Sequence, residues 1–143
     1  EYVDQNGQKQ RPVVIHRAIL GSSDRFISFL LEETKGNLPV WLSPVQVKIL
    51  TIADRHIEYA EKLEEKLERM GIRVELDSRE EKMGYKIREA QLQKIPYMLV
   101  VGDNEINEGK VSVRNRQSRE LVSMSQDEFI EKISKEAKAP SNN

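Results

Sequence analysis

The chain has 143 residues, enough for one full domain and little more. Its 23 Lys and Arg nearly balance 24 Asp and Glu at a net charge of −1, so no overall basic field points to nucleic acid, and any such binding must come from a local patch. The absence of cysteine excludes disulfides and thiolate metal sites, and no apolar run approaches the roughly 18–20 residues of a membrane span. With no basic and then apolar leader, the sequence predicts a cytoplasmic protein without a membrane partner. Because the chain starts at Glu1 rather than at Met, we expect a piece of a longer protein.

The first residues predict a β-hairpin. Asn6-Gly7 is a strong turn signal, so Tyr2-Val3 and the segment 11–17 are expected to pair as strands. The second of these segments carries the apolar run 13–15 and ends beside His16.

A helix is expected next, because Phe26, Phe29 and Leu30 recur at helical spacing. The run Gly-Asn-Leu-Pro at 36–39 stops this helix, and Trp41-Leu-Ser-Pro44 is typical of a bend into a new unit. We therefore place a domain boundary between about 36 and 43 and divide the chain into residues 1–38 and 39–143.

Beyond that boundary, strand and helix patterns alternate. The expected order is a strand at 45–52, a helix from Asp54 to Met70, a strand at 72–76, a helix from Asp77 or Ser78 to Lys94, a strand at 97–101, further strands at 110–113 and 120–124, and a last helix opened by the capping box Ser125 to Glu128. The βαβαβ order implies parallel strands with right-handed crossovers, and the last two strands are expected to be antiparallel. The predicted fold class is α/β, with a mixed five-stranded sheet flanked by helices and preceded by a strand and helix of another domain.

The segment 77–91 carries a high density of charge. On the expected helix, Lys82 and Lys86 share one face, and Arg88 is rotated by about 200° from Lys86. The pattern alone favours a solvated face with intrahelical ion pairs such as Lys86 with Glu89.

Three stretches also resemble a known family. The string His16-Arg-Ala-Ile-Leu-Gly-Ser-Ser-Asp-Arg-Phe26 resembles the third signature motif of class II aminoacyl-tRNA synthetases, in the form found in threonyl-tRNA synthetases. The segments 41–47 and 81–103 are similar to the anticodon-binding domain that the threonyl, prolyl, histidyl and glycyl enzymes share. The resemblance covers nearly the whole chain. It implies that residues 1–38 end a class II catalytic domain, that residues 39–143 form an anticodon-binding domain, and that the parent ligates threonine to its tRNA using ATP.

The resemblance also implies roles for residues of the second domain, with threonine tRNA as the partner and no DNA. Glu105 matches a loop carboxylate that contacts anticodon bases, which suits the N1–H and N2–H₂ donors of guanine. Arg114 matches a base-contacting arginine, Lys82 matches a cation near the same loop, and Arg88 could support the RNA backbone or its own domain. Glu80 departs from the family, because an amide that donates and accepts is common there, whereas a carboxylate only accepts.

In the first domain, the resemblance makes His16 the last of three ligands for a zinc ion that recognises threonine. It makes Arg25 an ATP contact, with Gly21 permitting close approach of the adenine. The remaining ligands and signature motifs would lie upstream of Glu1, and His56 is expected to begin a surface helix without a ligand-like companion. We therefore expect ATP and zinc to bind only in the parent protein, which would be a homodimer. This chain alone is expected to bind neither ATP nor zinc and not to catalyse aminoacylation.

Two other functions stay open from the residues. One is a small nucleotide-binding enzyme that uses Gly21 and Arg25, although Ile52-Ala-Asp54 stands where a Gly-rich phosphate loop would follow the first parallel strand. The other is a non-catalytic paralogue that keeps the anticodon-binding fold as an interaction module.

Overall fold

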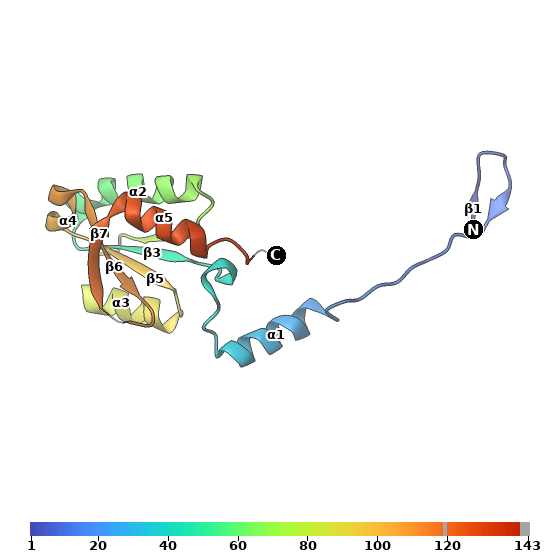
Figure 1. The fold of residues 1–143 in the computed structure, drawn as a ribbon, viewed down its shortest axis with the longest axis horizontal. Coiled ribbons are helices and arrows are strands. Elements are labelled where there is room, and N and C mark those ends of the chain that lie inside the picture. The colour runs from blue at the N-terminus through green and yellow to red at the C-terminus, as the bar shows by residue number, and fades with distance from the viewer. Residues whose placement is uncertain (119, 141–143) are drawn as a thin grey trace.

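A computed structural model describes residues 1–118 and 120–140, and it places a compact α/β domain after an extended N-terminal segment (Figure 1). The N-terminal segment contains β1 (Tyr2–Val3), β2 (Lys9–Gln10) and α1 (Ser23–Thr34). The domain contains η1 (Val40–Leu42), β3 (Val47–Thr51), η2 (Asp54–His56), α2 (Ile57–Arg69), β4 (Val74–Asp77), α3 (Met83–Leu92), β5 (Tyr97–Val101), α4 (Asp103–Glu108), β6 (Lys110–Asn115), β7 (Leu121–Ser125) and α5 (Gln126–Glu136).

The domain is built on one five-stranded mixed sheet in the order β4-β3-β5-β6-β7. Strand β3 pairs in parallel with β4 and with β5, while β6 and β7 complete the sheet in antiparallel pairs. This arrangement confirms the predicted fold class. It also brings the carboxyl ends of β3, β4 and β5 to a single edge of the sheet.

Helices cover both faces of the sheet. Helices α2 and α5 lie on one face and α3 lies on the other, as Figure 1 shows. The core under α2 and α5 is the larger one, and its fully buried members include Val47, Ile49, Leu63, Leu99 and Phe129. The core under α3 is smaller and contains Leu50, Ala90, Ile95 and Met98.

The predicted helix ends are partly right. Ser125 and Glu128 form the expected capping box of α5, with Ser125 N 2.9 Å from Glu128 Oε2 and Glu128 N 3.2 Å from Ser125 Oγ. Helix α3 begins at Met83 rather than after Asp77 or Ser78, so its first predicted turn is wrong. The helix predicted from Asp54 to Met70 is the short η2 followed by α2, which ends at Arg69; Met70 follows the last turn and is 55% exposed.

The N-terminal hairpin differs from its prediction. Strand β1 pairs with Lys9–Gln10, not with the segment 11–17. Gly7, at φ +76°, ends a three-residue loop that is closed by the hydrogen bond from Asp4 N to Gln8 O at 2.9 Å. Because the loop is this short, the strand that pairs with β1 ends before Arg11. Residues 11–17 form no strand, and the apolar side chains at 13–15 are more than 80% exposed.

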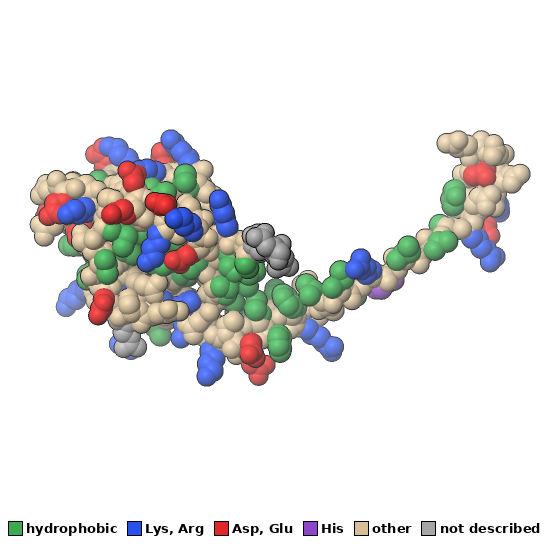
Figure 2. Space-filling model, viewed as in Figure 1, with side chains coloured by type: hydrophobic (Ala, Val, Ile, Leu, Met, Phe, Trp, Pro, Cys, Tyr) green, Lys and Arg blue, Asp and Glu red, His purple; other side chains and the backbone are tan. Residues whose placement is uncertain are grey.

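Helix α1 follows that exposed stretch and contributes nothing to the core. Ser22 caps it and Lys35 ends it in the left-handed conformation, yet none of its residues is buried. Phe29 and Ile27 are more than half exposed. The helix therefore forms where the sequence predicts it, with its apolar side chains facing outward along the green stretch of Figure 2.

Hydrogen bonds fasten the segment between α1 and β3 to the domain. Arg73 donates to the carbonyl oxygens of Trp41 at 2.8 Å and of Ser43 at 2.8 and 3.0 Å. Gln46 donates to Val40 O at 3.0 Å, and Arg116 donates to Leu38 O at 3.0 Å. The main chain from Leu38 onward thus lies against the domain. In the described ranges, no helix is both long and apolar enough to cross a membrane.

Candidate nucleic-acid interface

An open cleft lies where the parallel strands end. Its volume is about 450 Å³, and its walls come from the loop after β3 and the loop between β4 and α3. The lining residues are Thr51, Ile52, Ala53, Asp54, Arg79, Glu80, Glu81 and Lys82. Ligands of open α/β sheets bind outside the carboxyl ends of the strands, so this edge is a candidate binding site.

The loop between β4 and α3 is shaped by the buried carboxylate of Asp77. Arg79 donates to it from Nε at 2.9 Å and from a terminal nitrogen at 2.6 Å, and it also bonds Glu89 of α3. These hydrogen bonds hold the pKa of Asp77 below its usual value, although burial opposes the shift. Arg79 is itself half exposed at the cleft, next to the exposed side chains of Glu80 and Lys82.

Lys86 does not lie on a solvated face with Lys82, so that interpretation is wrong. The residue is 1% exposed, and its Nζ lies 3.0 Å from Thr51 O, 3.2 Å from Asp77 O and 4.0 Å from Asp77 Oδ1. Lys82 itself is the exposed N-cap residue of α3. The two lysines differ because α3 starts one residue after Lys82 and turns Lys86 toward the ends of β3 and β4.

Glu105 lies at the same edge, at the start of the short helix α4. Its Oε2 accepts the Gly102 N–H at 3.0 Å, and its Oε1 accepts the Ser112 hydroxyl at 2.6 Å. A Cβ on Gly102 would lie 2.6 Å from Ile52 Cδ1, so the exposed Ile52 side chain packs directly over this glycine. Glu105 is therefore a half-buried carboxylate whose position is set by its own helix and by β6.

His56 also differs from its prediction, because it is buried and has a partner. Its Nε2 lies 2.9 Å from Asp103 Oδ1, and its Nδ1 accepts the Ala53 N–H at 3.2 Å. That second bond assigns the ring proton to Nε2. Arg55 bonds the same carboxylate at 2.8 and 2.5 Å, and these bonds, with that of His56, hold the pKa of Asp103 well below its usual range. The cluster ties the loop after β3 to the start of α4.

Arg114 lies on β6, two residues beyond Ser112, so both side chains are on the face of the sheet that carries α3. Arg114 pairs with Met98 near the start of β5, whereas Ser112 pairs with Val100, so Arg114 lies two residues, about 6.8 Å, farther back from the cleft. Its buried Nε has no hydrogen-bond partner within the residues that the structure describes. Glu80 and Lys82 thus line the cleft and Glu105 lies at the same edge of the sheet. Arg114 lies farther back along β6, and Arg88 lies on the exposed side of α3.

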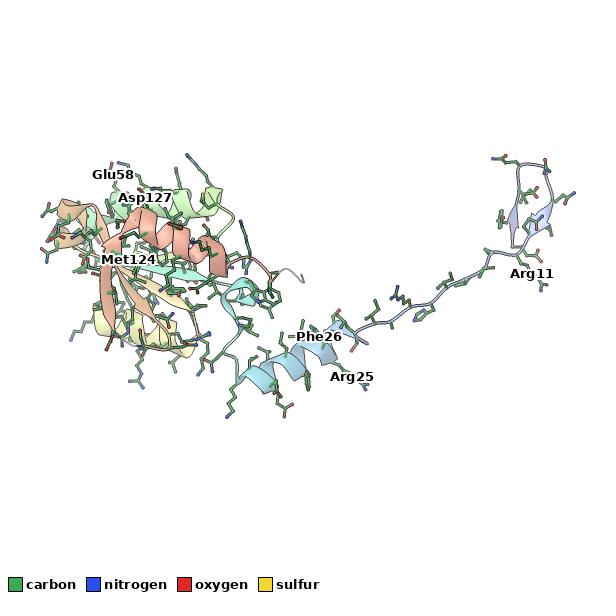
Figure 3. The ribbon with its side chains drawn as sticks, in the orientation of Figure 1. Arg11, Arg25, Phe26, Glu58, Met124 and Asp127 are labelled. Carbon is green, nitrogen blue, oxygen red and sulfur yellow. The ribbon has the colours of Figure 1, made fainter. Side chains whose placement is uncertain are left out.

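The three candidates of the N-terminal segment lie apart from this edge. His16 is exposed in an extended stretch, Gly21 adopts φ +71° with open space around it, and Arg25 lies on the exposed first turn of α1 (Figure 3). Among the described residues, no three His, Asp or Glu side chains gather in a way that could hold a metal ion. A zinc site needs three or four protein ligands, of which His16 could supply one.

The chain is similar to known proteins that bind tRNA anticodons or ligate threonine to tRNA. Residues 46–136 match the family model described as "Anticodon binding domain". The chain is 54% identical over 141 residues to a threonine–tRNA ligase of Clostridium botulinum (strain Okra / Type B1), which covers 99% of this chain and 22% of the relative. It is 57% identical over 136 residues to the threonine–tRNA ligase of Caldanaerobacter subterraneus subsp. tengcongensis, covering 95% of this chain and 21% of that protein.

A solved structure shares the fold. The crystal structure of the RNA binding domain of threonyl-tRNA synthetase from Cryptosporidium parvum Iowa II superposes with a TM-score of 0.78 at 42% identity. The match covers 85% of this chain and 30% of that one. The chain thus spans about a fifth of the length of the curated relatives that it matches.

Proposed function

Because the chain belongs to the family of anticodon-binding domains, we propose that it binds the anticodon loop of threonine tRNA as part of a threonine–tRNA ligase. The observation that carries this proposal is the coincidence of two findings. The family match spans residues 46–136, and within that range the fold brings the charged side chains of three loops to one edge of the sheet. The interaction-module alternative is not favoured, since more than half of the positions are identical to those of the ligases.

Glu105 is proposed to read guanine. Both of its oxygens already accept one hydrogen bond, from Gly102 and from Ser112. An ionised carboxylate offers about four lone-pair sites, so two remain for the N1–H and N2–H₂ of a guanine. Because its protein partners fix the carboxylate, little rotamer entropy is lost on binding.

Arg114 is proposed to contact a second base or its phosphate from the neighbouring strand, since its planar fork suits either group. Lys82, exposed at the rim of the cleft, would meet the phosphate backbone. Glu80 faces the same cleft but can only accept, so it would suit a base donor and not the acceptors of uridine. Arg88, on the outer side of α3, would at most contact a more distant phosphate.

The remaining roles concern the longer protein. We propose that residues 1–38 complete a catalytic domain that uses ATP and zinc, with Gly21 and Arg25 near the nucleotide and His16 as one metal ligand. The exposed apolar side chains of α1 and of the stretch before it support a partner domain for this segment. A homodimeric, cytoplasmic parent is part of the same proposal.

The test is RNA binding by the 143-residue chain. An anticodon stem-loop of threonine tRNA is titrated at fixed salt with the wild type, with Arg114→Ala and with Arg69→Ala as control, since Arg69 is an exposed arginine of α2 paired with Glu65. We expect Arg114→Ala to lose about 1–3 kcal/mol, or roughly 5- to 150-fold in affinity, while the control stays near the wild type. Equal affinities for all three proteins would refute the role of Arg114. Failure of the wild type to bind would refute the proposed function.

A further inference from the structure

Lys86 is a buried ammonium that the proposed contacts with RNA do not use. It is 1% exposed, and its Nζ reaches the carbonyl oxygen of Thr51 at 3.0 Å and that of Asp77 at 3.2 Å. The Asp77 carboxylate, at 4.0 Å, supplies the opposite charge. Burying an ammonium is unfavourable unless it is paired and hydrogen-bonded, so a lysine in this place is not a neutral choice for filling space.

The two carbonyls that Lys86 binds belong to the last residues of β3 and β4. Beyond these residues the chain leaves the sheet, and the loops that follow form the two walls of the cleft. Thr51 Oγ1 also donates to Asp77 O at 3.3 Å, so the ends of the two strands meet at the Lys86 ammonium. One side chain of α3 thereby joins the roots of both loops.

The loop between β4 and α3 depends on this junction through Asp77. The carboxylate of Asp77 is bonded by Arg79, and Glu81 N donates to Arg79 O at 2.8 Å, so the turn that presents Glu80 and Lys82 is built outward from Asp77. Lys86 contacts both the main chain and the carboxylate of that residue. A change at Lys86 is therefore transmitted to the exposed side chains without Lys86 touching a ligand.

We propose that Lys86 is a positioning residue for RNA recognition, because its ammonium fixes the ends of β3 and β4 and thereby the loop that carries Glu80 and Lys82. This inference rests on the proposed function. It adds a buried residue of α3 that would govern affinity and base discrimination from beneath the cleft.

The chain offers a matched control in Lys48. It is also a buried lysine, 2% exposed, and its Nζ bonds Glu75 at 2.9 Å and Gln93 at 3.2 Å. Lys48 lies near the beginning of β3, whereas Lys86 contacts the end of that strand. Replacing Lys48 removes a buried ammonium under the same helix while leaving the roots of the cleft loops intact.

The experiment compares Lys86→Met with Lys48→Met in the 143-residue chain. Urea unfolding gives the stability of each variant, and titration with the anticodon stem-loop and with a stem-loop changed at one anticodon base gives affinity and discrimination. We expect Lys86→Met to weaken binding at least about tenfold more than Lys48→Met at comparable stability, and to reduce the preference for the cognate loop. Equal losses that follow stability alone would overturn the proposal. If Lys86→Met does not fold, Lys86→Gln, which keeps a donor, replaces it under the same criterion.

Combining Lys86→Met with Lys82→Ala tests whether Lys86 acts through the loop between β4 and α3. In Lys82→Ala protein, we expect the effect of Lys86→Met on affinity to fall below about threefold, since much of what Lys86 positions is then missing. An effect of undiminished size would show that Lys86 does not act through this loop. Amide hydrogen exchange of residues 78–82 without RNA should rise in Lys86→Met and not in Lys48→Met. That readout separates failure of this inference, seen as unchanged exchange, from failure of the proposed function, seen as no binding by the wild type.

Discussion

Tyr97 provides a quantitative test of the fold, because a single oxygen atom can be removed from a well-defined contact. The residue is 2% exposed, and its hydroxyl donates to the Glu136 carboxylate, with the two oxygens at 3.0 and 2.9 Å. Its ring packs edge-on against Phe129, with centroids 5.7 Å apart, and that packing survives in phenylalanine. Tyr97→Phe therefore deletes a hydrogen bond to a charged group, and we expect it to cost about 1.5–3 kcal/mol at neutral pH.

The same contact predicts how this cost depends on pH. Burial, with the Glu136 hydrogen bond as the second cause, raises the pKa of Tyr97 from 10.0 to about 12. As pH rises above 10, the unfolded chain loses the tyrosine proton while the folded chain keeps it, so the wild type loses stability. The difference of about two pKa units between the folded and unfolded chain corresponds to about 2.7 kcal/mol of stability. About 1.4 kcal/mol of this stability should be lost by pH 11. Tyr97→Phe lacks this proton and should lack this part of the alkaline decline.

Urea unfolding of both proteins at pH 8 and pH 11 measures the effect. The advantage of the wild type should shrink by about 1.4 kcal/mol between the two pH values. Tyr59→Phe is the control: it removes a hydroxyl that donates to the carbonyl of Lys110 at 3.1 Å, and it should keep the alkaline decline because Tyr97 is intact. Parallel decline of the wild type and Tyr97→Phe would refute the argument that burial and Glu136 hold the proton on Tyr97.

Two further changes test the ends of α2 and α5. Ser125→Ala removes the side-chain cap of α5 and should lower the free energy of unfolding by about 1 kcal/mol. Ser125→Asp keeps a capping oxygen and should retain most of the wild-type stability. Equal stability of the Ala and Asp variants would contradict the capping role. Gly71 follows α2 at φ +79° with nothing near its missing Cβ, so Gly71→Ala should cost about 1–2 kcal/mol from backbone strain alone. Gly71→Asn should cost less, because asparagine tolerates the left-handed region, and thermal unfolding that ranks Asn below Ala would argue against strain as the cause.

The sheet could be predicted from the sequence because its signals are local. The continuous apolar run at 97–101 and the capping box at Ser125 each lie within a few residues, and the βαβαβ order then leaves little freedom of topology. The start of α3 was missed for the opposite reason. Asp77 has the chemistry of a helix cap, but its carboxylate is used by Arg79 and lies beside Lys86, and both uses depend on the folded loop.

The candidate site shows the same division. Parallel topology predicts that Glu80, Lys82 and Glu105 approach one another, since each follows the carboxyl end of a parallel strand. Burial of Lys86 and His56 could not be predicted, because their partners Thr51 and Asp103 lie 35 and 47 residues away in the chain. A signal for the cap formed by Glu105 was present, since it stands three residues after Gly102, the spacing of a capping carboxylate.

The attachment of the segment before β3 has a consequence for how this sequence can change over evolution. Arg73, Gln46 and Arg116 all bind carbonyl oxygens of that segment, and none of these bonds requires a particular side chain at the accepting position. The accepting residues Leu38 and Trp41 can therefore vary as long as the path of the main chain is kept, whereas Ser43 is buried, with its hydroxyl donating to Leu38 O and Pro39 O, and Val40 packs against the core. Replacing one of the three donors leaves carbonyl groups without their partner. An insertion in this segment would shift the carbonyls out of register with all three donors at once, so we expect length to be constrained here more tightly than composition.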